Sequence, residues 1–225
     1  MVSRGDSAAD IGTDHGYVPM LLVKNNISPR VIMSDISGGS LAKARETFKI
    51  AGLEADEKDY RIGDGLATIE PAEVDTIIIG GLGGLTIIDI LDADISKSKS
   101  YKNLVLQPRK HSGELRHYLY THGWDICEEV LAEEGKFQCE IILARPSDEE
   151  SRHELYRRGD IRWKYPEAMA LKNPELAAKR ISWKIGSIKE QLSNLESSNR
   201  DSSALVKELC SDKEYLEGLL HQTFI

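Results

Sequence analysis

The segment Ala8–Gly16, with the sequence AADIGTDHG, lies between a short apolar run and an amphipathic stretch. Ala8–Gly12 is predicted to form a β-strand and Tyr17–Asn26 an α-helix, so the segment is a strand-to-helix turn. In open α/β sheets, turns of this kind line the ligand crevice at the carboxyl ends of the strands. Gly12 and Gly16 allow backbone angles that other residues avoid and let a ligand approach the main chain. The segment therefore predicts an α/β fold with a binding site in its first turn.

The same alternation of strand and helix continues as far as Arg145. The predicted strands are Ala8–Gly12, Arg30–Asp35, Asp59–Ile62, Val74–Gly80 and Asn103–Gln107, and the predicted helices between and after them are Tyr17–Asn26, Gly39–Ala51, Gly84–Leu91 and Ser112–His122. Two more strands, Trp124–Leu131 and Phe137–Arg145, follow with no helix between them. Parallel strands with helical crossovers, closed by an antiparallel hairpin, match a Rossmann-like class I methyltransferase sheet. A dehydrogenase sheet normally ends in another crossover and a sixth parallel strand.

The chain changes character after Pro146, which divides it into a predicted Rossmann-like domain, 1–146, and a helical domain, 147–225. Two helices are expected in the second part, with a polar turn between them. The apolar positions of the first helix are Ile181, Ile185, Ile188, Leu192 and Leu195, and those of the second are Leu205, Leu209, Leu216 and Leu219. The first set recurs at steps of four and three, as in a coiled coil. An antiparallel coiled-coil hairpin follows, and both a self-contained hairpin and a partner-docking hairpin are compatible with it.

Composition excludes several classes of protein. Of the 225 residues, 40% are hydrophobic and 29% charged, which is typical of a globular chain. The apolar runs stop far short of the roughly 20 residues that span a bilayer, and the N-terminus has no stretch resembling a signal peptide. We therefore expect a cytoplasmic protein with no membrane partner. The three cysteines, Cys127, Cys139 and Cys210, are too few and too scattered for a disulfide framework or a zinc site, so no metal is expected.

The net charge of −8 argues against non-specific nucleic-acid binding, because Lys and Arg supply phosphate contacts. The second part of the chain nevertheless contains a local basic patch interleaved with aromatic residues. Its basic members are Arg152, Arg157, Arg158, Arg162 and Lys164, and its aromatic members are His153, Tyr156 and Trp163. Taken alone, this pattern fits a solvated helical face equally well.

The first turn carries two acids, Asp10 and Asp14, and its Gly-x-x-x-Gly spacing is not the dinucleotide fingerprint. These acids would repel a pyrophosphate. They suit a cationic ligand, and S-adenosylmethionine carries both a sulfonium and an ammonium group. The competing structural interpretation is that Asp10 caps local amides and that Asp14 or Thr13 N-caps the following helix.

Two further acids follow the next two strands. Asp35 comes 23 residues after Gly12, close to the spacing at which an acidic side chain accepts hydrogen bonds from ribose hydroxyls. In Gly63-Asp64-Gly65 the carboxylate could accept from the exocyclic amine of an adenine, although an ordinary turn aspartate is the simpler interpretation of that tripeptide alone. Acids at three successive strand ends, each near glycine, favour a binding site.

The last two parallel strands end in different kinds of turn. Gly80-Gly81-Leu82-Gly83-Gly84 follows the most apolar strand, and so many glycines indicate that a bulky, planar group approaches the main chain. At the end of the fifth strand, Gln107 could donate to and accept from a base edge, and Pro108 stiffens the turn before Arg109. Motifs of hydrolases, Walker-type nucleotidases and zinc proteases are absent from the sequence.

These motifs together resemble the bacterial TrmK-type tRNA methyltransferases, which methylate N1 of adenine 22 in tRNA. The resemblance rests on Ala9–Pro19, Gly63–Leu66, Gly83-Gly84 and Gln107-Pro108, followed by helices, and covers nearly the whole chain. It implies a class I methyltransferase fold, S-adenosylmethionine as cofactor, tRNA as partner and Asp14 as the catalytic aspartate. Leu82 stands where the family usually has methionine and Arg109 where it usually has asparagine. Only nine residues precede Asp10, so the family's leading helix is expected to be missing.

The motifs and the resemblance together predict a set of residues for each role. The catalytic residues are Asp14, Gln107 and Pro108. The cofactor-binding residues are Asp10, Gly12, Thr13, His15, Asp35, Ile36, Gly63, Asp64, Gly65, Gly80 and Gly81. The RNA-binding residues are Arg109, Arg152, Arg157, Arg158, Arg162 and Lys164. The oligomeric state is expected to be a monomer or a weak homodimer.

Three alternatives stay open at this point. The methyl acceptor could be another RNA, a protein or a small molecule, with the helical hairpin used for dimerisation. A non-catalytic protein that keeps the cofactor pocket is disfavoured, because Asp14 would have no reason to lie beside it. A nicotinamide enzyme is disfavoured by the acidic first turn.

Overall fold

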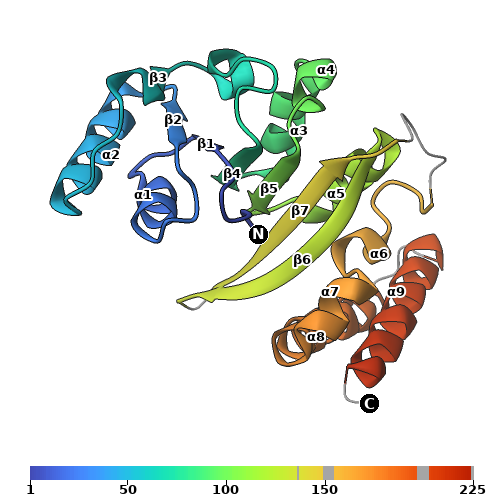
Figure 1. Cartoon of the computed structure of the whole chain (residues 1–225). Helices are drawn as coiled ribbons and strands as arrows, with labels where there is room; N and C mark the ends of the chain where they lie inside the picture. The colour runs from blue at the N-terminus through green and yellow to red at the C-terminus, as the bar shows by residue number, and fades with distance from the viewer. Residues whose placement is uncertain (136, 149–154, 197–202, 224–225) are drawn as a thin grey trace.

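The computed structural model describes residues 1–135, 137–148, 155–196 and 203–223. Its centre is a seven-stranded sheet with the order β3-β2-β1-β4-β5-β7-β6 (Figure 1). The strands are β1 Ala8–Ile11, β2 Val31–Asp35, β3 Tyr60–Ile62, β4 Thr76–Leu82, β5 Asn103–Pro108, β6 Trp124–Glu134 and β7 Phe137–Pro146. Strands β1 to β5 are parallel, whereas β7 is antiparallel to both β5 and β6. The predicted sheet, with its closing antiparallel hairpin, is confirmed.

Helices cover both faces of this sheet. They are α1 Tyr17–Lys24, α2 Gly38–Ile50, α3 Gly84–Asp92, α4 Ile95–Ser98 and α5 Ser112–Thr121, with short 3-10 turns η1 Glu57–Asp59 and η2 Gly65–Thr68. Successive strand residues point to opposite faces, so Ile77 and Ile79 of β4 pack in the core beneath α3 and α5, whereas Ile78 packs on the face of α1. Both faces are buried at the central strand β4, which explains its continuous apolar run Ile77–Ile79.

The differences from the predicted bounds have local causes. Strand β1 ends at Ile11 because Gly12 takes a positive φ of 76°, which breaks the extended backbone. Strand β6 reaches Glu134, further than the predicted Leu131, because it pairs with β7 up to the turn at Gly135. Strand β7 begins at Phe137, as predicted. The sequence pattern did not predict α4, which is only four residues long.

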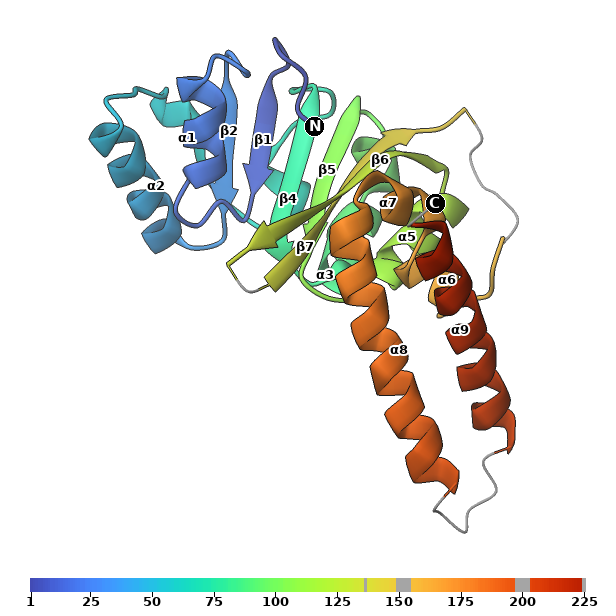
Figure 2. The same ribbon diagram turned by 90° about the horizontal axis from the view of Figure 1, so that it is seen from below.

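The C-terminal part contains α6 Ile161–Lys164, α7 Glu167–Lys172, α8 Pro174–Glu196 and α9 Ser203–Gln222. Helices α8 and α9 lie side by side and project away from the sheet (Figure 2). Ile185 and Ile188 of α8 share a core with Leu209 and Leu216 of α9. Leu205, which was expected in the apolar stripe, is 46% exposed. The predicted pair of helices is confirmed, and its coiled-coil geometry stays a prediction.

The helices are joined to the sheet rather than separate from it. Leu131 of β6 belongs to the same apolar core as Tyr165 and Met169. The predicted domain boundary at residue 146 therefore stays a prediction, since the core of the second part includes a residue of the first.

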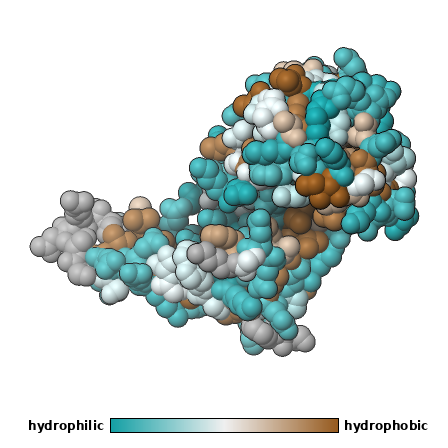
Figure 3. All heavy atoms as spheres, turned by 90° about the vertical axis from the view of Figure 1, so that its left-hand side faces the viewer, coloured by the Kyte–Doolittle hydropathy of each residue, from teal (hydrophilic) through white to brown (hydrophobic). Residues whose placement is uncertain are grey.

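Figure 3 looks onto the side of the molecule that carries α1 and α2, and hydrophobic side chains appear there in small groups among hydrophilic ones.

A buried arginine holds the C-terminal helices against the sheet. Arg116 of α5 is 1% exposed, and its Nε and Nη2 donate to Glu129 of β6 and Glu140 of β7, each at 2.5 Å. Its Nη1 donates to the carbonyl of Trp163 in α6 at 3.1 Å, and Arg180 of α8 also pairs with Glu140. Charges this deeply buried are tolerated only when they are paired and hydrogen-bonded. One cluster therefore links α5, both strands of the hairpin and two C-terminal helices.

We expect Arg116→Met to lower the free energy of unfolding by about 3–5 kcal/mol, because it leaves Glu129 as a buried charge without its partner. Urea denaturation followed by circular dichroism measures the change. Arg158→Met, at an exposed arginine, is the matched control and should change stability by no more than about 0.5 kcal/mol. Equal denaturation midpoints for the two variants would contradict the role given to Arg116.

Candidate active site

A cleft of about 1400 Å³ opens at the carboxyl ends of the parallel strands. Side chains from the turns after β1, β2, β3, β4 and β5 line it, as the sheet topology requires. All the residues predicted to bind the cofactor are part of this lining: Asp10, Gly12, Thr13, His15, Asp35, Ile36, Gly63, Asp64, Gly65, Gly80 and Gly81. Asp14, Gln107 and Arg109 also line the cleft, whereas Pro108 does not. The structure thus gathers residues that are up to about 100 positions apart in the sequence.

No side chain of the turn between β1 and α1 caps the N-terminus of α1. The N-cap of α1 is Gly16, with a φ of 68° and no side-chain cap. Neither Thr13 nor Asp14 therefore fills the helix-capping role that was the competing interpretation. A Cβ on Gly16 would lie 2.8 Å from the Cβ of Ala44 in α2, so this glycine is required by packing. Asp14 itself has a φ of 42°, a left-handed conformation that is uncommon outside glycine.

Asp10 is the buried acid of the site. Its side chain accepts a hydrogen bond from the Thr13 hydroxyl at 2.7 Å, which gives Thr13 a role in holding Asp10. Burial raises the pKa of Asp10 to about 6, the Thr13 hydrogen bond opposes this shift, and the nearby Asp35 carboxylate adds to it. A cationic ligand in the cleft would favour the ionised form of this carboxylate.

Asp35 and Asp64 follow the next two strands. The Asp35 carboxylate accepts from the backbone N–H of Ser37 at 2.8 Å and from that of Asp14 at 3.3 Å, so it ties the second turn to the first. Asp64 precedes η2 without making a side-chain cap. A Cβ on Gly63 would lie 2.2 Å from Thr68, so this turn is also shaped by packing within the protein.

Asp14 lies at the exposed mouth of the cleft. Its side chain is 55% exposed, and its two oxygens contact Lys43 Nζ of α2 at 3.0 Å and His15 Nδ1 at 2.7 Å. The hydrogen bond from Lys43 is the main reason why the pKa of Asp14 is lowered. The His15 ring stacks on Tyr17 with centroids 5.4 Å apart. Asp14 is therefore an ionised, accessible carboxylate held by two neighbours.

The turns after β4 and β5 differ from the expectation in two respects. The Gln107 amide oxygen accepts from the backbone N–H of Gly81 at 2.6 Å, so one of its two lone pairs is used within the protein. A Cβ on Gly84 would lie 2.3 Å from the carbonyl oxygen of His111. The bulky group that approaches Gly84 is therefore the protein's own backbone. Gly80 and Gly81, by contrast, line the cleft as predicted.

Two sides of the cleft are lined by residues that the sequence pattern did not predict. Asp89 and Asp94, on α3 and at the start of α4, line one side, and Cys139 and Ile141 of β7 line another. The alternation of β7 puts Cys139 and Ile141 on one face of the strand. Nothing in the sequence shows that β7 inserts next to β5, which is what brings that face to the cleft.

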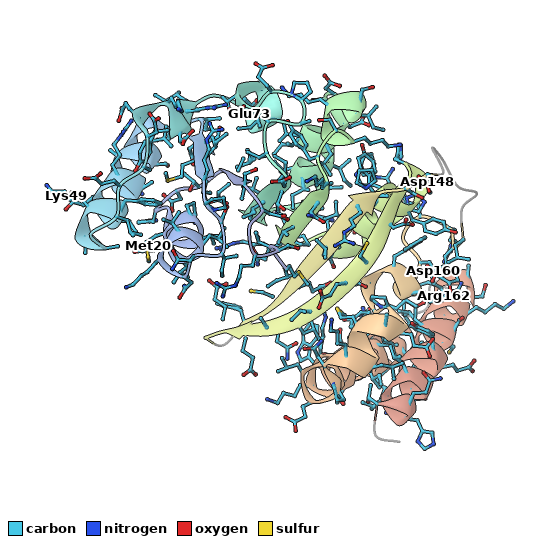
Figure 4. All side chains as sticks on the ribbon, in the orientation of Figure 1. Met20, Lys49, Glu73, Asp148, Asp160 and Arg162 are labelled. Atoms are coloured by element: carbon cyan, nitrogen blue, oxygen red, sulfur yellow. The ribbon has the colours of Figure 1, made fainter. Side chains whose placement is uncertain are left out.

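The predicted RNA-binding residues that the structure describes differ in their surroundings. Arg157 pairs with Glu208 of α9 at 2.6 Å. Arg162 pairs with Asp160 at 2.8 Å and lies over the Tyr156 ring, and Figure 4 shows Asp160 and Arg162 next to each other.

The remaining members of that set are placed differently. Arg158 is exposed. Lys164 shares a second hollow with Arg109. Arg152 lies outside the described residues.

Among the described residues, no group of three or more His, Cys, Asp or Glu side chains is placed to hold a metal ion. No helix within the same ranges is long and apolar enough to cross a membrane.

The sheet order and the ligand cleft at its carboxyl edge define a Rossmann-like methyltransferase fold. A family model described as a methyltransferase domain matches residues 1–142 of the chain. The chain therefore belongs to this methyltransferase family.

Individual relatives agree with the fold. The tRNA (adenine(22)-N(1))-methyltransferase of Bacillus subtilis is 33% identical over 153 residues, which is 68% of this chain and 64% of that protein. The match thus spans less than two thirds of the relative's length. Among solved structures, Sp1610 of Streptococcus pneumoniae superimposes with a TM-score of 0.81 at 24% identity, covering 98% of this chain and 95% of that one. An uncharacterised Listeria monocytogenes protein gives a TM-score of 0.82 at 26% identity, covering 97% and 94%.

We expect Asp10→Asn to make the ligand-free protein more stable than the wild type above pH 6. When folding raises the pKa of an acid, the free energy of unfolding falls as the pH rises from the ordinary pKa, near 4, to the raised pKa. The advantage of the variant should therefore shrink as the pH falls from about 6 towards 4. Thermal unfolding between pH 4 and pH 8 measures it.

The control for this experiment is Asp56→Asn, at an exposed carboxylate whose pKa is lowered by Lys58. Its stability difference from the wild type should be small or of the opposite sign. A difference for Asp10→Asn that does not vary with pH would show that burial does not perturb Asp10.

Proposed function

We propose that the protein is an S-adenosylmethionine-dependent tRNA (adenine(22)-N(1))-methyltransferase. The observation that carries the choice of substrate is the likeness to the B. subtilis enzyme of that name within a chain of the methyltransferase family. The acid-lined cleft supports the choice of cofactor. Because tRNA is a cytoplasmic substrate, the same proposal places the enzyme in the cytoplasm.

The chemistry of the cleft fits S-adenosylmethionine, which would supply a methyl group on a positively charged sulfur. Asp10, a buried carboxylate, suits one of its two cationic groups. Asp35 would hold the ribose hydroxyls and Asp64 the adenine amine, as their positions after successive strands imply. Gly80 and Gly81 would let a planar ring lie against the backbone.

Asp14 would act on the target base. As N1 of adenine is methylated, positive charge develops on the ring, and only groups that favour this charge accelerate the reaction. A carboxylate about 4 Å from the ring is worth about 4 kcal/mol at an effective dielectric of 20, and the exposure of Asp14 lowers this figure. Asp14 would also accept a proton from the exocyclic amine, which becomes more acidic on methylation. Gln107, whose oxygen accepts from Gly81 and whose side chain also hydrogen-bonds the Cys139 thiol, would donate a remaining amide N–H to the base.

The basic residues predicted from the sequence are proposed as tRNA contacts. Arg109 lines the cleft, and Arg158 and Lys164 are exposed. Arg157 and Arg162 would first have to exchange their carboxylate partners for phosphates. We propose that the protein is a monomer or a weak homodimer.

The pure protein, incubated with labelled S-adenosylmethionine and total tRNA, should transfer label to 1-methyladenosine, and nucleoside analysis identifies that product. Gel filtration of the same sample gives the oligomeric state. Label in another RNA, in protein or in a small molecule, but not in tRNA, would replace the proposed substrate. A dimer in that case would support hairpin-mediated association.

We expect Asp14→Ala to bind S-adenosylmethionine with near-normal affinity in calorimetry but to lose at least about a hundredfold in methylation rate. The reason is that the carboxylate acts on the base rather than on the cofactor. Asp56→Ala, an exposed acid that does not line the cleft, is the control and should keep the wild-type rate. Near-normal turnover by Asp14→Ala would remove Asp14 from the mechanism.

A further inference from the structure

A second hollow, of about 680 Å³, lies beside the cleft. It is bounded by the turn between β5 and α5, the β6–β7 hairpin, the end of α6 and the first half of α8. Its size is within the range of ordinary ligand pockets, about 300–1000 Å³. We call it the basic groove, after the cations Arg109, Lys110, Lys164, Lys179 and Arg180 that line it.

The groove carries a local excess of positive charge. Its two carboxylates, Glu133 and Glu140, are both paired, with Lys179 at 3.5 Å and with the arginines of the buried Arg116 cluster. The exposed side chains of Arg109, Lys110 and Lys164 have no ion pair among the residues that the structure describes. A chain with a net charge of −8 therefore presents three exposed cations in one hollow, of which Lys164 also interacts electrostatically with Glu114 of α5.

The fold brings these cations together from separate elements. Arg109 and Lys110 follow β5, whereas Lys164 ends α6. The backbone N of Lys164 lies 3.3 Å from where a Cβ on Gly113 would be, so the absence of a side chain at Gly113 lets α6 sit against the start of α5. This packing puts Lys164 beside the turn after β5.

An exposed indole completes the groove. Trp183 of α8 is 73% exposed, whereas Trp124 and Trp163 are buried. A large, exposed aromatic ring next to cations is the combination with which proteins hold single-stranded nucleic acid, since bases stack on the ring and phosphates contact the cations. Packing against the described part of the chain thus leaves most of the Trp183 side chain exposed.

The groove continues the cleft. Arg109 lines both hollows, and it follows Gln107, which faces the cleft, by two residues. A target base must leave its stack to enter the cleft, and where it lies in a single-stranded segment its neighbours along the strand are unpaired as well. Those neighbours would reach the groove next.

We infer that the basic groove holds the RNA strand adjacent to the target adenine: Trp183 stacks an unpaired base, and Arg109, Lys110 and Lys164 contact its phosphates. This inference rests on the proposed RNA substrate. It shifts the main RNA contact from the Arg157–Arg162 region, where two arginines are already paired, to a surface continuous with the cleft.

The first test uses Trp183, by far the most exposed of the three tryptophans. Trp183→Ala should weaken binding of total tRNA about 5- to 150-fold, the range for loss of one stacked base, and Trp183→Phe should restore most of it. Titration with tRNA should quench the fluorescence of the wild type, and the quenching should disappear in Trp183→Phe. The affinity for S-adenosylmethionine, measured by calorimetry, should not change.

The second test uses charge. The double variant Lys110→Glu/Lys164→Glu should raise the Kd for tRNA at least about tenfold and reduce the slope of log Kd against log salt by about 1.5, as expected for two lost phosphate contacts. The control is the double variant Lys24→Glu/Lys49→Glu, which changes the net charge by the same amount but on α1 and α2. Figure 4 shows Lys49 away from the C-terminal helices. Circular dichroism verifies that each variant is folded.

The outcomes separate the two proposals. If the wild type neither binds nor methylates tRNA, the proposed function fails. If the wild type does both, the groove variants can be judged. The inference is overturned if Lys110→Glu/Lys164→Glu matches Lys24→Glu/Lys49→Glu in affinity and salt slope, and if Trp183→Ala binds tRNA, and Trp183→Phe is quenched, as the wild type is.

Discussion

Three carboxylates share one cleft because parallel strands end at the same edge of the sheet. Asp10, Asp35 and Asp64 follow β1, β2 and β3, and the order β3-β2-β1 makes them neighbours. Acids this close repel one another, and the repulsion is visible in the raised pKa of Asp10, to which burial and then Asp35 contribute. A cationic ligand would relieve this repulsion, because an opposite charge favours the ionised form of a carboxylate.

The buried Arg116 cluster determines what lies next to that cleft. Glu140 sits on β7, two residues from the Gln138 that lines the basic groove and one from the Cys139 that lines the cleft. By binding Glu140 together with Arg180, Arg116 holds α8 against the β6–β7 hairpin. The position of Trp183, one turn further along α8, therefore depends on an ion pair that is remote from the chemistry.

The sequence predicted the sheet because runs of β-branched residues and glycine-bounded turns are local signals. It predicted the floor of the cleft for the same reason, since each acid directly follows its strand. Other features depend on contacts that no local pattern records. Gln107 accepts a hydrogen bond from Gly81 because β4 and β5 shift register at that point. Arg116 is unremarkable in a helical sequence until β6 and β7 bring two glutamates to it.

The division of charge between the two hollows explains how an acidic protein can handle a polyanion. Charges separated by more than about 8–10 Å are largely screened at physiological ionic strength, so the overall charge matters less than the local field. The acids of the cleft would repel phosphate as strongly as they attract a cationic methyl donor. With the proposed RNA substrate, phosphates would be confined to the basic groove beyond Arg109, and the uncharged base would be the part of the RNA that gains by entering the cleft. The same carboxylates that suit the donor would thus select which end of the nucleotide reaches it.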